Sequence, residues 1–285
     1  MNEENIENQG STEPNPSTSL IKYTPNNPPW NSLEALGLWL LSIVAIVILP
    51  TLAVIPYLLK QNIKFSDPAI ITKAAMEPGA ILIQIATIIP AHILTVLVAW
   101  MVITRFNKHS FTKMLGWNWA GYNWWQVVLI MVGLLVLVFG VSIAMSQIFG
   151  QKDNDLLKIL RSSRYAVFLV AFMATISAPF VEEVIYRGVL YSAFQRTFSI
   201  PIAVLLVTFV FALVHFPQYW GDYATLTTLL FLSLVITLIR VKTGSLLPCI
   251  LFHFLINGIQ SALLILQPYL PEALDPTRIQ SFFFG

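Results

Sequence analysis

Seven long apolar runs constrain the fold of this chain more than any other feature of its sequence. Of its 285 residues, 56% are hydrophobic and only 11% are charged, whereas a soluble domain carries about 25% charged residues. A helix of about 20 apolar residues crosses the hydrocarbon core of a bilayer, because a helix rises about 1.5 Å per residue. The pattern predicts an all-α, multi-pass membrane helical bundle surrounded by lipid, which we expect in the plasma membrane.

The predicted spans are separated by polar or very short segments. The runs cover residues 33–59, 79–104, 124–149, 165–196, 200–216, 224–239 and 245–266. An eighth span would arise if the long fourth run breaks near Pro179 or Gly188, because apolar stretches buried among helices can be short or interrupted. We therefore expect seven or eight transmembrane helices.

Composition divides the chain into four parts. Residues 1–32 are rich in Asn, Glu, Pro, Ser and Thr, which predicts a disordered polar tail. Residues 33–164 hold the first three spans, and residues 165–266 hold the remaining spans. Residues 267–285 contain three prolines and are expected to form an irregular C-terminal tail.

The charge balance excludes one class of partner and leaves the orientation open. The formal net charge is only +2 and the basic residues are spread along the chain, so we expect no nucleic acid partner. Lys and Arg divide evenly between the two sides of seven spans, so the positive-inside rule selects neither orientation. The single cysteine, Cys249, excludes an internal disulfide, and we expect it to be a small buried side chain rather than a nucleophile.

Six ionisable side chains lie well inside the predicted spans, and five of them belong to the second half of the chain. They are His92, Glu182, Glu183, Arg187, His215 and His253. An ionisable group in hydrocarbon is costly unless it is paired or faces a wet cavity, so such groups predict a functional site. For His92 alone, we expect a hydrogen-bonded contact between helices.

Helix geometry brings three of these groups to one depth. Glu182 and His215 are equally distant from the turn at residues 198–199, so they lie at one level on antiparallel helices. His253 lies nine residues beyond Gly244, the expected next turn. It reaches the same level if the end of the fourth helix projects about two turns into water. The spacing predicts one pocket that collects these side chains.

Three short motifs in this half of the chain resemble those of a membrane protease family. EEVIYR at 182–187 is similar to an EExxxR motif, FALVH at 211–215 to FxxxH, and HFLIN at 253–257 to HxxxN. These are the motifs of the CPBP family of intramembrane proteases. That family includes the type II CAAX prenyl endopeptidases and bacterial proteins described as abortive-infection or bacteriocin-immunity proteins. The resemblance covers residues 165–266, which we expect to be a CPBP-like protease core.

The resemblance implies an intramembrane endopeptidase whose substrate is a membrane-embedded or lipidated peptide, such as a prenylated CAAX protein. Hydrolysis requires a base that activates water. Glu182, the first glutamate of the motif, fits this role because apolar surroundings raise the pKa of a carboxylate. Glu183 and Arg187 are four residues apart, so they can pair on one helix face and leave Glu182 free.

The other two motifs supply the remaining roles that the resemblance implies. His215 would position the water or share its proton. His253 and Asn257, on one helix face, would hold the substrate carbonyl and the oxyanion that forms from it. Phe211, one turn before His215, would shape the wall of the pocket that binds substrate.

A zinc ion is a competing use of the same atoms. Two histidines and a carboxylate, here His215, His253 and Glu182, form a known type of catalytic zinc set. The resemblance favours a glutamate-activated water with no cofactor, and the sequence contains no HExxH pair. Activity that survives exhaustive chelation would decide between the two.

Two further classes of function stay open at this point. A proton-coupled transporter could use the same side chains as a relay, although the chain lacks the paired interrupted helices in matching halves that such transporters carry. A non-catalytic immunity or scaffold protein could share the fold, and alanine at the motif positions would then leave its phenotype intact.

Overall fold

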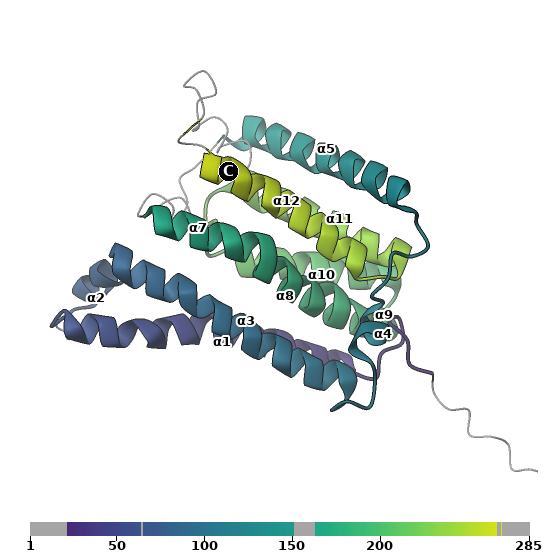
Figure 1. Cartoon of the computed structure of the whole chain (residues 1–285), viewed down its shortest axis with the longest axis horizontal. Helices are drawn as coiled ribbons and strands as arrows, with labels where there is room; N and C mark the ends of the chain where they lie inside the picture. Colours follow the sequence, from purple (N-terminus) through teal and green to yellow (C-terminus); the bar gives the residue numbers. More distant parts are fainter. Residues whose placement is uncertain (1–21, 64, 151–162, 267–268, 270–285) are drawn as a thin grey trace, which may run out of the picture.

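The computed structural model describes residues 22–63, 65–150, 163–266 and 269, and this part of the chain is a bundle of helices (Figure 1). Six helices are long and apolar enough to cross a membrane, which confirms a multi-pass membrane protein. They are α1 (Ser32–Lys60), α3 (Pro78–Thr104), α5 (Trp124–Phe149), the composite helix Arg164–Thr197, α11 (Tyr223–Thr243) and α12 (Leu247–Leu266). The fifth predicted span is the shorter apolar helix α10 (Ile200–His215).

Polar side chains at the ends of the apolar runs fix where the helices begin and end. Asn31 and Glu34 form a reciprocal capping box at the start of α1. Asn123 and Gln126 do the same for α5. Gly244 ends α11 with a φ of +64°, a conformation that glycine adopts without strain. Such caps lie just outside hydrophobic runs, so hydropathy predicted the span boundaries closely.

The fourth span is one continuous helix that changes its winding four times. Its parts are α7 (Arg164–Phe172), the π-helical η1 (Met173–Ser177), α8 (Ala178–Glu183), the π-helical η2 (Val184–Leu190) and α9 (Tyr191–Thr197). The helix does not break near Pro179 or Gly188, so the six long helices and α10 account for the seven predicted spans, and the alternative of an eighth is not found among the described residues. Pro179 is the second residue of α8, so the change of winding at the end of η1 lies next to the residue that lacks a backbone N–H.

The composite helix lies at the centre of the bundle. Figure 1 shows α1 and α3 side by side along one edge, and the composite helix lies between this pair and α12. Helix α11 packs on α10, α12 and α5, and α5 forms the opposite edge. Two short helices, α2 (Pro68–Ala75) and α4 (Phe111–Leu115), lie at the two ends of α3.

The largest cluster of buried apolar side chains surrounds η2. Val184 and Leu190 of η2 are fully buried against Ile103 of α3, Leu115 of α4 and Leu246. Because this cluster draws on segments from both halves of the chain, the first three spans take part in holding the central helix in place.

Residues 22–31, here called the N-terminal strap, correct one prediction. The strap packs against the bundle and buries the whole side chain of Trp30, whose indole Nε1–H donates to the carbonyl of Val189 at 3.0 Å. The prediction of a disordered tail is therefore wrong for residues 22–32, while residues 1–21 lie outside the described residues. The predicted C-terminal tail, 267–285, also lies outside them except for Tyr269.

Candidate active site

The two motif glutamates end a six-residue α-helix that is enclosed by π-helical turns. Glu182 and Glu183 are the last residues of α8, and Arg187 lies in the middle of η2. Adjacent helix positions point about 100° apart, so the two carboxylates face different surroundings. Glu182 keeps 24% of its side chain exposed, whereas Glu183 is fully buried.

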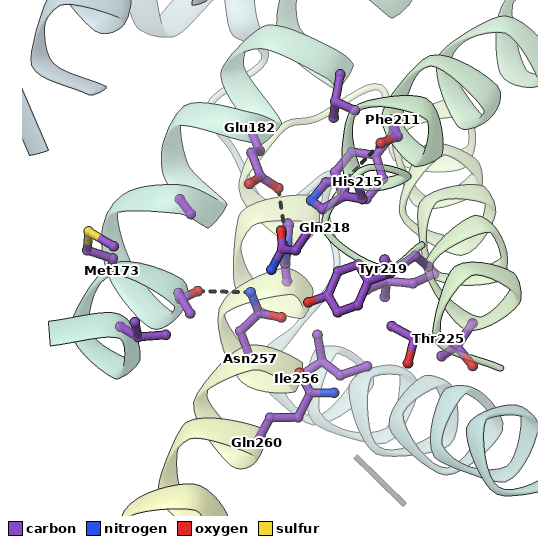
Figure 2. Close-up of a pocket in the computed structure, with 18 of the residues that line it drawn as sticks. Met173, Glu182, Phe211, His215, Gln218, Tyr219, Thr225, Ile256, Asn257 and Gln260 are labelled. Carbon is purple, nitrogen blue, oxygen red and sulfur yellow. Dashed lines mark hydrogen bonds and ion pairs between the residues drawn. The ribbon is translucent and has the colours of Figure 1, made fainter. Parts of the chain in front are cut away.

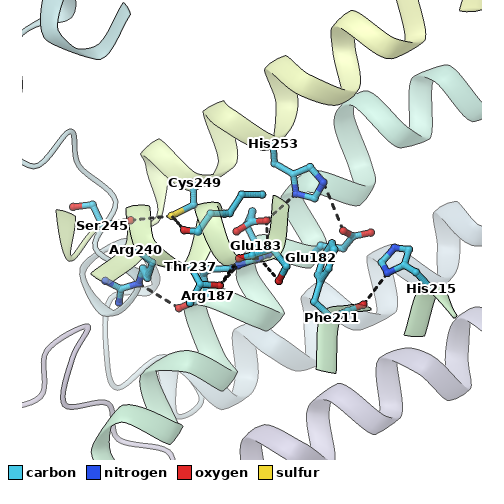
Figure 3. Close-up of polar contacts among 12 residues, drawn as sticks. Glu182, Glu183, Arg187, Phe211, His215, Thr237, Arg240, Ser245, Cys249 and His253 are labelled. Atoms are coloured by element: carbon cyan, nitrogen blue, oxygen red, sulfur yellow. Dashed lines mark hydrogen bonds and ion pairs between the residues drawn. The ribbon is translucent and has the colours of Figure 1, made fainter. Parts of the chain in front are cut away.

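Glu183 and Arg187 form a completely buried ion pair. Nη1 of Arg187 donates to Oε1 of Glu183 at 2.9 Å, and neither side chain is exposed. The same oxygen lies 2.8 Å from Nδ1 of His253. The predicted pairing of Glu183 with Arg187 is thus confirmed, and it extends to His253 on α12 (Figure 3).

One face of α11 holds the guanidinium of Arg187. Its Nη2 donates to the carbonyl and the hydroxyl of Ser233 at 2.9 and 2.8 Å, and its Nε donates to the hydroxyl of Thr237 at 3.2 Å. The guanidinium also lies 4.9 Å from the centre of the Phe211 ring. These contacts neutralise and fix a charge that would otherwise be unstable inside the bundle.

Sequence analysis missed the residues of this α11 face. It assigned Arg240 to a loop, but Arg240 lies in the last turn of α11 and is fully buried. Ser233, Thr237 and Arg240 follow one another at intervals of four and three residues, so they share one helix face. This spacing of two hydroxyl side chains and one cationic side chain in an apolar run could have predicted a shared polar face of the helix.

His253 lies between the two glutamates. A carboxylate paired with arginine is ionised and can only accept, so Nδ1 of His253 carries the proton and donates to Glu183. Its Nε2 then faces Glu182, 3.8 Å from Oε2. Glu183 therefore sets the tautomer of His253 and turns the other ring nitrogen toward the exposed carboxylate.

His215 has the same tautomer for a different reason. Its Nδ1 lies 2.8 Å from the carbonyl oxygen of Phe211, one turn earlier in α10. A carbonyl can only accept, so Nδ1 carries the proton and Nε2 is available to the cavity. Figure 2 places the His215 ring close to Glu182, with the side-chain amide of Gln218 beside the same carboxylate.

These groups line a cavity of about 550 Å³ in the middle of the bundle. Glu182, His215, His253 and Asn257 border it, while Glu183 and Arg187 are absent from the described lining and lie behind its wall. One side is apolar and comes from α1 and α3, with Ile43, Ile46, Ile85 and Ile88. The other side is polar and comes from α12 and the α10–α11 connection, with Gln218, Tyr219, Asn257 and Gln260.

Tyr219 adds a neutral hydroxyl to the polar side of the cavity. Desolvation and, to a smaller extent, the nearby carboxylate of Asp222 raise the pKa of its phenol above the ordinary value. The phenol therefore stays protonated at neutral pH. Figure 2 shows its oxygen directed toward Asn257.

Asn257 is anchored to the composite helix. Its Nδ2 donates to the carbonyl of Ala174 in η1 at 2.8 Å. A primary amide has two N–H groups, so the second one is still available for the role that sequence analysis assigned to Asn257. Phe211 is almost fully buried and packs edge-to-face on Tyr186 and His253.

The zinc alternative needs three ligands that converge on one ion. Among the residues that the structure describes, no three His, Cys, Asp or Glu side chains are grouped in this way. Nδ1 of both histidines of the proposed set is hydrogen-bonded within the protein and Nε2 faces the cavity, as in histidines that bind zinc. Independence of metal stays a prediction, and no step below is routed through a metal.

Two predictions for side chains outside the motifs are confirmed. Nδ1 of His92 lies 3.1 Å from the hydroxyl of Ser177, which joins α3 to η1. Cys249 is fully buried, and its thiol contacts the carbonyls of Ser245 and Ile236 at 3.5 and 3.6 Å. His92 borders the cavity that contains Glu182, whereas Cys249 is absent from its described lining.

Comparison with known protein families agrees with the motifs. Residues 164–259 match the sequence model of the Rce1-like type II CAAX prenyl endopeptidase family. The matched segment runs from α7 into α12 and contains every candidate site residue. The predicted resemblance is confirmed over this segment, and at family level it supports a membrane endopeptidase. No curated protein and no solved structure matched the chain.

Proposed function

We propose that this protein is an intramembrane endopeptidase that uses a water activated by Glu182. The observation that carries the proposal is the contrast between the two adjacent glutamates. Glu183 is fully buried and bound by Arg187 and His253, whereas Glu182 is partly exposed at the cavity with Nε2 of His253 beside it. One carboxylate is structural and the other is available for chemistry.

Proton transfer follows from the positions of the side chains. Glu182 takes a proton from water as the water oxygen attacks the scissile carbonyl carbon. The carbonyl oxygen becomes an oxyanion, and it accepts hydrogen bonds from the second amide N–H of Asn257 and from His253 when its Nε2 is protonated. Glu182 then gives its proton to the leaving amine as the C–N bond breaks. His215 orients the water through its Nε2.

The two sides of the cavity suit an amphipathic substrate. Isoleucine side chains of α1 and α3 can cover an apolar or lipidated part of a peptide, while Asn257 and Gln260 of α12 can bind its backbone. A membrane-embedded or lipidated peptide, including a prenylated CAAX sequence, combines both properties. No metal or organic cofactor takes part in this proposal.

The test is proteolysis by purified protein in liposomes. The substrates are a fluorogenic farnesylated CAAX peptide and a pool of membrane peptides, with products identified by mass spectrometry. We compare wild type with Glu182→Gln and His253→Gln, with and without a chelator. Glu77→Gln and His109→Gln are matched controls, because they make the same chemical changes outside the cavity.

The proposal expects cleavage by wild type and both controls, loss in both site variants, and no effect of chelation. Cleavage by Glu182→Gln at the wild-type rate would contradict the role of Glu182. Loss of activity under chelation that zinc restores would contradict the metal-free mechanism. Flux of a solute into protein-containing liposomes, without cleavage, would instead support a transporter.

A further inference from the structure

Some backbone carbonyls in the π-helical turns of the composite helix accept hydrogen bonds from side chains of other segments. The amide of Tyr191 donates to the carbonyl of Tyr186, five residues back, which is the π-helical pattern. Two other carbonyls of η2, those of Arg187 and Val189, accept hydrogen bonds from side chains remote in sequence. A π-turn is rarely stable by itself and occurs mostly at functional sites, so these bonds need an explanation.

Arg240 provides the first of these bonds. Its Nε donates to the carbonyl of Arg187 at 3.2 Å, and its Nη2 donates to Pro25 of the strap and to the hydroxyl of Ser192. Among the described residues it pairs with no carboxylate, and its Nη1 has no partner. A buried guanidinium without an ion pair is costly. What Arg240 provides at this position is therefore its hydrogen bonds to backbone carbonyls, not the neutralisation of a charge.

Trp30 provides the second bond. The side chain is fully buried, and its Nε1–H donates to the carbonyl of Val189 at 3.0 Å. This tryptophan precedes the first span and lies outside the segment that matches the protease family. The strap therefore contacts the backbone of η2 at a point two residues beyond the carbonyl bound by Arg240.

Arg187 connects the conformation of η2 to the candidate active site. Its backbone carbonyl is bound by Arg240, while its guanidinium is bound by Ser233 and Thr237 and donates to Glu183. If η2 rewound as an α-helix, the residues on either side of it would rotate relative to each other by up to about 100°. The guanidinium would then leave Ser233 and Thr237 of α11. Because it stays paired with Glu183 at i,i+4, it would draw that carboxylate away from Nδ1 of His253.

We propose that Arg240 and Trp30 are positioning residues that hold η2 in its π-helical form and thereby fix the Glu183–His253 pair behind the cavity. They act through the backbone and touch no reacting atom. The effect on hydrolysis rests on the proposed function, but the effect on the conformation of η2 and on the tautomer of His253 does not.

The first test measures conformation without activity. Arg240→Met and Trp30→Phe each remove the donor, while the first keeps an unbranched stem and the second an aromatic ring. Hydrogen exchange with mass spectrometry reports the protection of η2. Long-range ¹H–¹⁵N correlation spectra of ¹⁵N-histidine protein report the tautomer of His253, whose signals are those missing in His253→Gln. Lys242→Met and Trp125→Phe are matched controls on exposed side chains.

We expect exchange in η2 to rise about 10- to 100-fold in both variants, the range for losing one hydrogen bond from a buried group. We also expect His253 to lose its single Nδ1–H tautomer, while both controls stay like wild type. Wild-type protection and an unchanged tautomer in the folded variants would overturn the proposal. If Arg240→Met does not fold, the result for Trp30→Phe decides, because that change keeps most of the buried ring.

The second test uses the peptide assay. We expect kcat to fall about 10- to 100-fold in Arg240→Met, with KM unchanged because Arg240 does not border the cavity as described. Arg240→Lys should recover part of the loss. An unchanged kcat despite altered η2 exchange would overturn the positioning role. If wild type cleaves nothing, the proposed function fails, and the exchange and tautomer measurements still decide the conformational claim.

Discussion

The buried pair of Glu183 and Arg187 offers the most stringent test of how the site is held together. Oε1 of Glu183 accepts from Arg187 at 2.9 Å and from His253 at 2.8 Å. Each hydrogen bond to a charged group contributes about 1.5–3 kcal/mol, against about 0.5–1.5 kcal/mol for a neutral one. Glu183→Gln keeps the acceptor but not its charge, so the bond with His253 becomes a neutral one and loses about 1 kcal/mol. The change also leaves Arg187 as an uncompensated buried cation.

Removing one partner of a buried ion pair costs about 3–5 kcal/mol in total, and we expect this destabilisation for Glu183→Gln and for Arg187→Met. The double variant has no buried charge left at this position. Its destabilisation should therefore be smaller than the sum of the two single values by about 2 kcal/mol or more, within the range for residues in direct contact. The assay is equilibrium unfolding in mixed micelles, with the four proteins compared in a double-mutant cycle.

The exposed pair of Glu34 and Arg105 is a matched control within the same protein. Both side chains keep about a third of their surface exposed (34% and 31%). Exposed pairs couple by only about 0.2–1 kcal/mol, so the same cycle on this pair should give a small value. A coupling below about 0.5 kcal/mol for Glu183 and Arg187 would refute the view that they clamp the site.

Three further changes separate chemistry from stability. Glu182→Gln should abolish hydrolysis while changing the unfolding free energy by less than about 1 kcal/mol, because the carboxylate is partly exposed; a large loss of stability would contradict this. Trp30→Ala should destabilise by about 3–5 kcal/mol in the same unfolding assay, and a loss below about 1 kcal/mol would mean that the strap is dispensable. Gly116→Ala should lower the melting temperature more than Gly188→Ala. At Gly116 φ is +67° and a Cβ would lie 2.5 Å from the backbone oxygen of Gly244, whereas at Gly188 it would meet only a leucine methyl. The reverse order of melting temperatures would contradict this reasoning.

The central helix illustrates what sequence reasoning left open. Pro179 and Gly188 both favour interruption of a helix, so a break in this apolar run, and with it an eighth span, stayed an alternative. The chain instead continues through two π-turns. Local propensity could not reveal this, because carbonyls in those turns are bound by Asn257 and Trp30, which lie 83 and 159 residues away in sequence.

Three site residues could be located from the sequence because depth in a membrane is a one-dimensional quantity. Counting residues from a turn gives the level of Glu182, His215 and His253, since every helical residue adds the same rise. The structure places all three at one cavity. Which nitrogen of each ring faces that cavity depends on the partner of Nδ1, and the sequence contains no information about it.

The sequence by itself determined that this chain is a multi-pass helical membrane protein with a protease-like second half. Hydropathy, caps and short motifs are local properties, and the bilayer converts apolar length directly into a spanning helix. Only the tertiary structure decided that Glu183 also binds His253, that Arg240 is buried, and that the strap belongs to the fold. These outcomes depend on hydrogen bonds between distant segments, because a buried polar group takes whichever partner the packed helices bring to it.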